Sequence, residues 1–224
     1  MIAYYAMIFI AFPLIAYVIA STPFGVIIAR SQGIDLRQHG SGNVGATNVG
    51  RVVGKKWGYL CFALDVSKGL VPVLATGLFL QRGGQHPSTV EQLAWLLVGF
   101  ATIMGHMLSF WLKFRGGKGV ATSLGMVLGF WPYLTVAGLA GFTVWILVTL
   151  ITRYVSVGSI VACAVLPVFF VIRCLVWGPS LMEVMPLLIF VATMAALVIY
   201  RHRSNMGRLL RGQESKIGPK RPAK

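Results

Sequence analysis

The chain has 224 residues, of which 57% are hydrophobic and 11% are charged, with only five acidic residues and a formal net charge of +15. Soluble domains carry about 25% charged residues, so this composition excludes an ordinary soluble protein. The positive charge does not indicate a nucleic-acid partner, because the basic residues lie between apolar runs, where they suit an anionic membrane leaflet and anionic substrates.

Apolar runs long enough to cross a bilayer recur along the whole chain, since a hydrocarbon core of about 30 Å takes roughly 20 helical residues. The first run lacks a basic segment before it and is too long for a signal peptide, so we expect a retained span. A single helix over 120–152 would be about 50 Å long, and this run contains Trp131-Pro132. We therefore expect two helices that turn at Pro132, of which the first is short. The predicted spans cover residues 3–29, 57–80, 93–112, 120–131, 133–152, 156–177 and 186–200.

The distribution of basic residues sets the predicted orientation, because cytoplasmic loops are enriched in Lys and Arg. About seven spans, with the N-terminus outside and the C-terminus cytoplasmic, place nearly all of these residues inside, whereas one crossing fewer would place the basic tail outside. The sequence thus predicts an all-α, polytopic integral membrane protein with a single membrane-embedded domain over 1–224. Its polar, glycine-rich segments then face the cytoplasm together. They cover residues 30–56, 105–122, 153–159 and 200–214, followed by a basic tail over 215–224 to which we assign no role.

Several common chemistries are excluded by what the chain lacks. Cys61, Cys163 and Cys174 lie inside apolar runs without paired spacing, which indicates small core residues and not disulfides or metal ligands. Only two aspartates are present, and neither a G-x-S-x-G elbow nor a His-x4-Asp motif occurs. We expect no metal and no cofactor, and a chemistry that depends on positioning and on the stabilisation of negative charge.

The segment GSGNVGATNVGR, residues 40–51, contains the G-x-G-x-x-G pattern of dinucleotide-binding proteins. The acid that this pattern requires would be Asp65, but Asp65 lies inside an apolar span and no strand–helix–strand unit accompanies it. Glycines let the backbone approach a ligand, backbone N–H groups of such a loop bind anions, and Arg51 adds a cation. An ordinary turn is the alternative. The other candidate ligand residues here are Ser41, Gly42, Asn43, Thr47 and Asn48.

The segment RGGKG, residues 115–119, is not a Walker A loop, because Leu112 and Val120 replace the glycine and the hydroxyl residue of that motif. Gly-Gly-Lys-Gly at the start of a helix nevertheless offers exposed N–H groups, the positive end of the helix dipole and a lysine, all of which suit a phosphate. A basic loop at the membrane edge is the alternative. The candidate phosphate-binding residues here are Lys113, Gly116, Gly117, Lys118 and Gly119.

The last polar segment places His202 and Asn205 at i and i+3, on one face of a tail helix beside Arg201 and Arg203. These residues form either a ligand site or a basic surface that contacts anionic lipid. Ser156 is likewise either a site residue or a helix cap.

Ionisable residues also occur within or near the predicted spans. Asp65 and Lys68 are at i and i+3 inside a span, where charge is costly, so we expect an internal ion pair that positions the helix. His106 lies near the inner end of its span and is either a substrate ligand or a core histidine.

Three segments carry a resemblance to a known family, namely GSGNVGATNVGR, GH…LKFRGGKGVAT and RHRSN…RLL. From about Phe24 to Glu214 the chain closely resembles the bacterial acyl-phosphate:glycerol-3-phosphate acyltransferases, the PlsY family, although Ser109 stands where relatives often carry proline. The resemblance implies transfer of a fatty acyl group from acyl phosphate to the 1-hydroxyl of sn-glycerol 3-phosphate, which gives lysophosphatidic acid and phosphate in the first acylation step of phospholipid biosynthesis. It also implies a place in the bacterial inner membrane with the active site facing the cytoplasm.

The resemblance assigns roles by motif position. The implied catalytic residues are Ser41, Arg51, Lys118, Ser156, His202 and Asn205. The cations and the GGKG backbone would hold the phosphates, and the hydroxyl, imidazole and amide groups would orient the glycerol hydroxyl or polarise the acyl carbonyl. The base is either His202 or a phosphate group of the substrate, and the resemblance favours the phosphate, without an acyl-enzyme.

The implied partners are the two substrates, membrane lipid and an enzyme that supplies the acyl phosphate. A transporter or binding protein for an organic phosphate is the alternative function. Transporters place their sites near the bilayer midplane and often contain internal repeats. Here the polar segments lie at the predicted inner edge and we find no repeat, so the acyltransferase is favoured.

Overall fold

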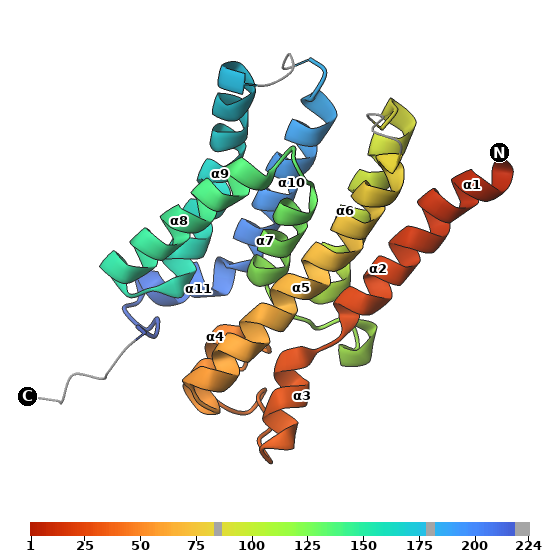
Figure 1. Ribbon diagram of the computed structural model, residues 1–224. Coiled ribbons are helices and arrows are strands. Elements are labelled where there is room, and N and C mark those ends of the chain that lie inside the picture. Colours follow the sequence, from red (N-terminus) through yellow and green to blue (C-terminus); the bar gives the residue numbers. More distant parts are fainter. Residues whose placement is uncertain (83–86, 178–181, 218–224) are drawn as a thin grey trace, which may run out of the picture. The chain divides into compact units, whose positions relative to one another are not determined.

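The computed structural model describes residues 1–82, 87–177 and 182–217, and all of its regular structure in these ranges is helical (Figure 1). The prediction of an all-α fold is therefore confirmed over the described residues. The chain forms two compact units, Met1–Thr135 and Val136–Lys224. Segments 30–56 and 105–122 belong to the first unit, and segments 153–159 and 200–214 belong to the second. Residues 218–224 of the predicted basic tail lie outside the described residues.

The first unit holds a broken N-terminal helix followed by a bundle. Its elements are α1 (Ile2–Ala6), the π-helical segment η1 (Met7–Ala11), α2 (Phe12–Ser21), α3 (Phe24–Ser31), α4 (Ala46–Val52), α5 (Lys55–Leu80), α6 (Thr89–Met107), the 3₁₀ turn η3 (Phe110–Leu112) and α7 (Val120–Gly129). The second unit holds α8 (Thr135–Thr152), α9 (Val155–Trp177), α10 (Met185–Arg201) and α11 (Arg203–Leu210).

Each predicted span contains helical structure, but the first, 3–29, is divided into α1, η1, α2 and α3 with a break at Thr22–Pro23, and the helices differ in length. Within the described residues, five are long and apolar enough to cross a membrane, and α10 with α11 forms a further pair that is bent by 50°. The expected break at Pro132 is present, since α7 ends at Gly129 and α8 begins at Thr135. The ten residues of α7 span only about 15 Å, roughly half of a hydrocarbon core. The number of crossings and the orientation of the termini stay predictions.

Backbone contact through glycine holds the first unit together. A Cβ atom added at Gly125 of α7 would lie 1.9 Å from the carbonyl oxygen of Val66 on α5, and one added at Gly69 of α5 would lie 2.2 Å from that of Thr122. Small residues permit such contact between membrane helices, where apolar side chains gain little by leaving lipid. The start of α7, where the RGGKG segment ends, is therefore fixed against the middle of α5.

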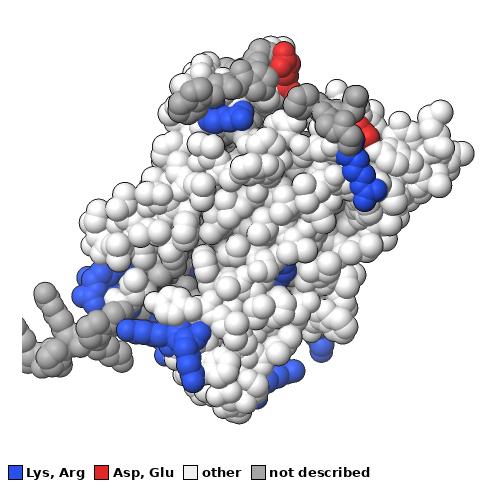
Figure 2. All heavy atoms as spheres, in the orientation of Figure 1, with Lys and Arg blue, Asp and Glu red and all other residues white. Residues whose placement is uncertain are grey.

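The lipid-facing surface of the first unit is apolar. Ile10, Leu14, Ile15 and Val18 expose about half of their surface along η1 and α2. In Figure 2 the surface over the middle of α5 is almost entirely free of charged side chains, and Lys and Arg gather near the end that carries α3 and α4. This pattern fits a helix bundle in a bilayer with its basic end at a headgroup layer.

The second unit is held by α9, which packs against α8 and α10. A Cβ atom added at Gly158 of α9 would lie 2.2 Å from Thr149 Oγ1 of α8, and Trp145 Nε1 donates a hydrogen bond of 3.1 Å to Ser159 Oγ. The described C-terminal segment returns to the turn between α8 and α9, because Ile217 N donates to the carbonyl oxygen of Arg153 at 2.8 Å.

The α5–α7 contact predicts that Gly125→Ala destabilises the protein, because the added methyl group meets a backbone carbonyl that cannot rotate away. We expect a loss of about 1–3 kcal/mol of unfolding free energy, the usual cost of overpacking. Thermal unfolding of the purified protein in detergent measures it. Gly141→Ala in α8 is the matched control, since its nearest neighbour lies at an ordinary 3.5 Å. Equal stabilities of the two variants would contradict the backbone contact.

Candidate functional site

The first polar segment is organised by the side chain of Asn48. Its Oδ1 accepts a hydrogen bond of 2.9 Å from the backbone N–H of Ser41, and its Nδ2 donates to the carbonyl oxygens of His39 at 3.0 Å and Leu36 at 3.3 Å. Gly40 has a φ of 63°, and a Cβ atom there would lie 2.3 Å from Asn48 Oδ1. Asn48 is 1% exposed, so its amide holds the loop in shape and places Ser41.

The other predicted ligand residues of this segment lie at its surface. Asn43 Oδ1 accepts a hydrogen bond of 2.9 Å from Gly45 N immediately before α4, which fixes the entry to that helix. Ser41, Thr47 and Arg51 are exposed, as is Gly42. The segment therefore exposes hydroxyl groups and one guanidinium at the protein surface. The buried amide of Asn48 holds the backbone of the loop through hydrogen bonds.

A contact that the sequence did not indicate joins this segment to the RGGKG segment. Arg37 Nη2 donates to the carbonyl oxygen of Arg115 at 3.1 Å and to that of Leu112 at 3.5 Å. The structure thus joins the residues that precede the 40–51 segment to the backbone of the RGGKG segment within the first unit. Arg37 lies in the predicted cytoplasmic segment 30–56, and its contacts could not be predicted, because backbone acceptors leave no pattern in a sequence.

The RGGKG segment folds back against the end of α6. Gly116 N donates to the carbonyl oxygen of Met107 at 3.0 Å, and Gly117 N donates to that of His106 at 3.2 Å. Gly119 has a φ of 88° and is the N-cap of α7. Lys118, between Gly117 and Gly119, is half-buried, while Lys113 is exposed with a φ of 52°. The loop therefore delivers a lysine directly to the positive end of a helix, a combination that favours an anion.

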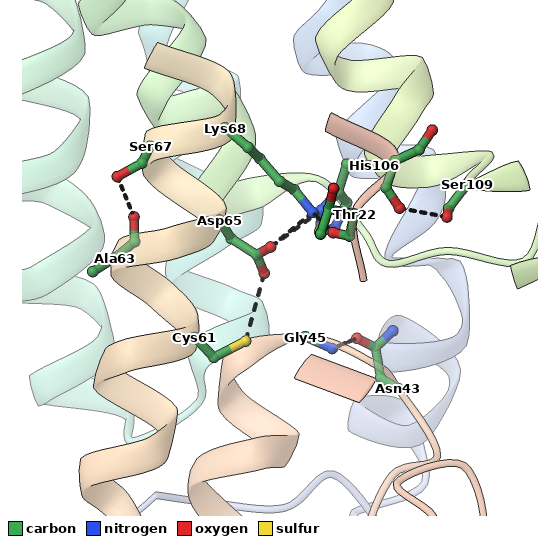
Figure 3. A network of polar contacts seen from close by, with 11 residues as sticks. Thr22, Asn43, Gly45, Cys61, Ala63, Asp65, Ser67, Lys68, His106 and Ser109 are labelled. Atoms are coloured by element: carbon green, nitrogen blue, oxygen red, sulfur yellow. Dashed lines mark hydrogen bonds and ion pairs between the residues drawn. The ribbon is translucent and has the colours of Figure 1, made fainter. Parts of the chain in front are cut away.

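Beneath this loop lies a buried polar network, drawn in Figure 3. Lys68 Nζ lies 2.8 Å from Asp65 Oδ1, as the i, i+3 spacing predicts, and donates a hydrogen bond of 2.9 Å to the carbonyl oxygen of Thr22. His106 Nδ1 lies 3.8 Å from the same Asp65 oxygen. Ser109 Oγ donates to the carbonyl oxygen of Ser21 at 2.6 Å. The network thus satisfies carbonyl groups at the break between α2 and α3.

In the second unit the central group is Glu214, the last residue of the family resemblance. Its Oε1 accepts hydrogen bonds from Ser156 Oγ at 2.8 Å and from Asn205 Nδ2 at 2.6 Å. Its Oε2 lies 2.7 Å from Arg208 Nε. Glu214 therefore joins the start of α9 to α11 and brings together two of the predicted catalytic residues. One signal was available, since Glu214 is one of only five acids in the chain and lies in its most basic segment.

The remaining predicted residues of the second unit surround the bend between α10 and α11. His202 lies at this bend, and its Nδ1 is 2.8 Å from the carbonyl oxygen of Val198. Because a carbonyl oxygen only accepts, Nδ1 carries the proton, and Nε2 is the acceptor of the neutral ring. Arg201 is half-buried, and the exposed Arg203 lies over the ring of Tyr200 at 4.5 Å. The imidazole is thus fixed in one tautomer.

The hydrogen bonds around Glu214 shift its proton affinity. Burial raises the pKa of this carboxyl, but the bonds from Asn205, Ser156 and Arg208 outweigh burial and hold the pKa below its ordinary value of 4.5. The group is consequently ionised at neutral pH. Among the described residues, no three His, Cys, Asp or Glu side chains are grouped as metal ligands.

Comparison with known proteins gives consistent matches. A family model described as glycerol-3-phosphate acyltransferase matches residues 10–212. The chain is 41% identical over 210 residues to the glycerol-3-phosphate acyltransferase of Synechococcus elongatus (93% of this chain, 94% of the relative). It is 43% identical over 202 residues to that of Trichlorobacter lovleyi (90% and 94%).

Solved structures agree with these matches. A crystal structure of PlsY (YgiH), an integral membrane glycerol 3-phosphate acyltransferase in its glycerol 3-phosphate form, matches with a TM-score of 0.77 and 39% identity over 92% of this chain and 94% of that one. A lysophosphatidic acid form matches with a TM-score of 0.75 and 38% identity over the same shares of the two chains. The prediction of a helical integral membrane protein is thereby confirmed.

The depressed pKa of Glu214 predicts a pH-dependent stability. An acid whose pKa is lower in the folded state stabilises the fold above its unfolded pKa, and this stabilisation is lost as the pH falls through the folded value. We expect Glu214→Gln to lose ~1–3 kcal/mol at neutral pH, the worth of hydrogen bonds to a charged group. The difference from wild type should vanish in acid, as measured by unfolding between about pH 3 and pH 7. Glu183→Gln, at an exposed glutamate, is the control, and a pH-independent difference for Glu214→Gln would contradict the assignment.

Proposed function

Because the chain belongs to the glycerol-3-phosphate acyltransferase family, we propose that it transfers a fatty acyl group from acyl phosphate to the 1-hydroxyl of sn-glycerol 3-phosphate. The products are lysophosphatidic acid and inorganic phosphate. The observation that supports this proposal is the bond from Arg37, just before the 40–51 segment, to the backbone of the RGGKG segment. It links the surroundings of two segments that we expect to bind phosphate, and the reaction handles two phosphate groups. The forms of the solved relatives, with glycerol 3-phosphate and lysophosphatidic acid, correspond to a substrate and a product.

The first unit supplies the groups that hold phosphate. Lys118 and Arg51 provide charge, and the backbone around Gly117 and Gly119 precedes the N-terminus of α7, whose dipole favours an anion. Exposed Ser41 contributes a hydroxyl group from a loop that Asn48 fixes. Charge that moves onto the leaving phosphate during the reaction is stabilised by such fixed donors without reorganisation, which is an efficient form of catalysis.

The second unit holds three further residues of the family motifs, each with a fixed polar side chain. Ser156, His202 and Asn205 are each held in one orientation, the first and last by Glu214 and the imidazole by Val198. In our proposal they orient the glycerol hydroxyl or polarise the acyl carbonyl. Fixed groups of this kind lower the barrier by placement and need no reorganisation during the step.

The transfer is a single displacement in which every atom stays with the two substrates. The 1-hydroxyl oxygen attacks the carbonyl carbon of the acyl phosphate, and the bond from that carbon to the phosphate oxygen breaks. The hydroxyl proton ends on the departing phosphate, which serves as the base, with His202 Nε2 as the alternative acceptor. No acyl-enzyme forms, and no metal or cofactor enters the step.

The cellular setting follows from the same proposal. The protein lies in the bacterial inner membrane with its site toward the cytoplasm, where glycerol 3-phosphate is soluble and the acyl chain of the donor remains in the lipid. An enzyme that synthesises acyl phosphate supplies the donor, and the product stays in the membrane for further acylation.

Purified protein with palmitoyl phosphate and glycerol 3-phosphate should form lysophosphatidic acid and release phosphate. We expect Lys118→Met to lower kcat/KM by about 100-fold or more, the usual effect of removing a preorganised electrostatic group, with an unchanged unfolding midpoint. Lys55→Met, at an exposed lysine at the start of α5, is the matched control. Absence of turnover by the wild type in lipid would refute the acyltransferase and favour a transporter or binding protein for an organic phosphate.

The orientation is tested by single cysteines in intact cells. Thr89→Cys at the start of α6 should react with a membrane-impermeant maleimide added outside, and Ser215→Cys should react only after the membrane is opened, because both residues are exposed. Cells with the unaltered chain measure the background from Cys61, Cys163 and Cys174. The opposite pattern would invert the predicted topology.

A further inference from the structure

The Gly116–Gly117 pair lies directly on the side chain and carbonyl group of His106. A Cβ atom added at Gly116 would lie 2.0 Å from the carbonyl oxygen of His106, and one added at Gly117 would lie 2.2 Å from His106 Nε2. Together with the hydrogen bonds from these two glycines to α6, the imidazole forms a surface against which the loop is shaped. Movement of the ring toward Gly117 is blocked by the loop, and movement away leaves the loop with its backbone hydrogen bonds to α6 but without the imidazole against it.

The imidazole in turn lies close to charged residues of α5. Its Nδ1 lies 3.8 Å from Asp65 Oδ1, and Asp65 lies 2.8 Å from Lys68 Nζ. Lys68 donates to the carbonyl oxygen of Thr22, and Cys61 Sγ lies 3.7 Å from the other Asp65 oxygen. The side chains of Asp65, Lys68 and His106 are all at most 7% exposed. A continuous series of contacts thus runs from the break after α2, through α5, to the glycine loop. Figure 3 shows the part of it from Thr22 to His106.

Stability alone does not explain this series. Buried ion pairs are often no more stabilising than apolar residues of the same size, because desolvation offsets their attraction. The α5–α7 packing is already provided by glycine contacts at Gly69 and Gly125. A buried charge pair can hold a neighbouring polar group in one orientation. The polar group next to the Asp65–Lys68 pair is the imidazole of His106, which lies beneath the loop.

We propose that Asp65, Lys68 and His106 form a positioning network for the phosphate-binding loop. Lys68 fixes Asp65, Asp65 orients the imidazole, and the imidazole holds the Gly116 and Gly117 peptides so that Lys118 reaches the start of α7 in one geometry. These three residues act through the loop and not on the substrate, since His106 is buried with its ring nitrogens directed at Asp65 and Gly117. The name phosphate-binding loop rests on the function proposed above, whereas the support of the loop by His106 does not.

Hydrogen exchange of the full-length protein in detergent, without substrate, tests this network. The amides of Gly116 and Gly117 are hydrogen-bonded to α6 and are protected in the wild type. In His106→Ala and in Asp65→Asn we expect these two amides to exchange about tenfold faster or more, as local opening becomes easier, while the amides of α5 and α7 keep their protection. His106→Gln, whose amide can reach the position of Nε2, should slow exchange again relative to His106→Ala.

The control is Ser67→Ala, an exposed position on α5 whose hydroxyl bonds only to the carbonyl oxygen of Ala63. Wild-type exchange in both network variants would overturn the proposal, as would faster exchange along α5 and α7 as well, because that result indicates a general structural role. Exchange in His106→Ala as slow as in the wild type would by itself remove the imidazole as the support.

Kinetics of the same variants add a second readout. If the phosphate-binding loop is displaced, phosphate binds more weakly both before and during the chemical step. The KM of a phosphate substrate should therefore rise by about tenfold, which is more than kcat falls. Unchanged KM values in active variants would count against the network. If the wild type shows no acyl transfer, the proposed function fails while the exchange result still decides whether the network supports the loop.

Discussion

A backbone group inside a bilayer must find its hydrogen-bond partner within the protein, because no water is available there. The break at Thr22–Pro23 leaves carbonyl groups of α2 without helical partners, and Ser109 and Lys68 supply the donors. This requirement explains why a lysine is tolerated inside a span and why Asp65 accompanies it. The polar groups of the first unit are therefore concentrated where the helices break, and the candidate site uses the same positions.

Glycine has two separate roles in this chain. In the first polar segment, Gly40 adopts a positive φ beside Asn48, whereas Gly50 touches Gly58 of α5 so closely that a Cβ atom on Gly58 would lie 2.6 Å from it. The first glycine shapes a loop and the other two let helices meet. The G-x-G-x-x-G pattern itself consists of Gly40, Gly42 and Gly45, of which the first two have positive φ and the third is the N-cap of α4, so it reflects the shape of the loop and not a dinucleotide site.

Much of the fold followed from local signals, and much of the site did not. The lengths of the apolar runs and the position of Pro132 were sufficient to predict the helices and the break between α7 and α8. The i, i+3 spacing of Asp65 and Lys68 was sufficient to predict their ion pair. The contacts of Glu214 and of Arg37 are long-range and involve single side chains, which leave no periodic trace. Asn48, expected as a ligand, has its amide occupied by its own loop. The number of crossings could not be settled by length either, since α7 is too short to cross by itself.

The end of the described chain has a practical consequence for handling the protein. Ile217 N donates to the carbonyl oxygen of Arg153, and Arg153 Nε donates back to that of Ile217 at 3.1 Å. Lys216 Nζ also lies over the ring of Tyr154 at 5.3 Å. The segment that carries Glu214 is thereby fastened on both sides of the turn between α8 and α9. An affinity tag or protease site at the C-terminus belongs after Ile217. One placed earlier would displace the segment that carries Glu214, which bonds to Ser156, Asn205 and Arg208.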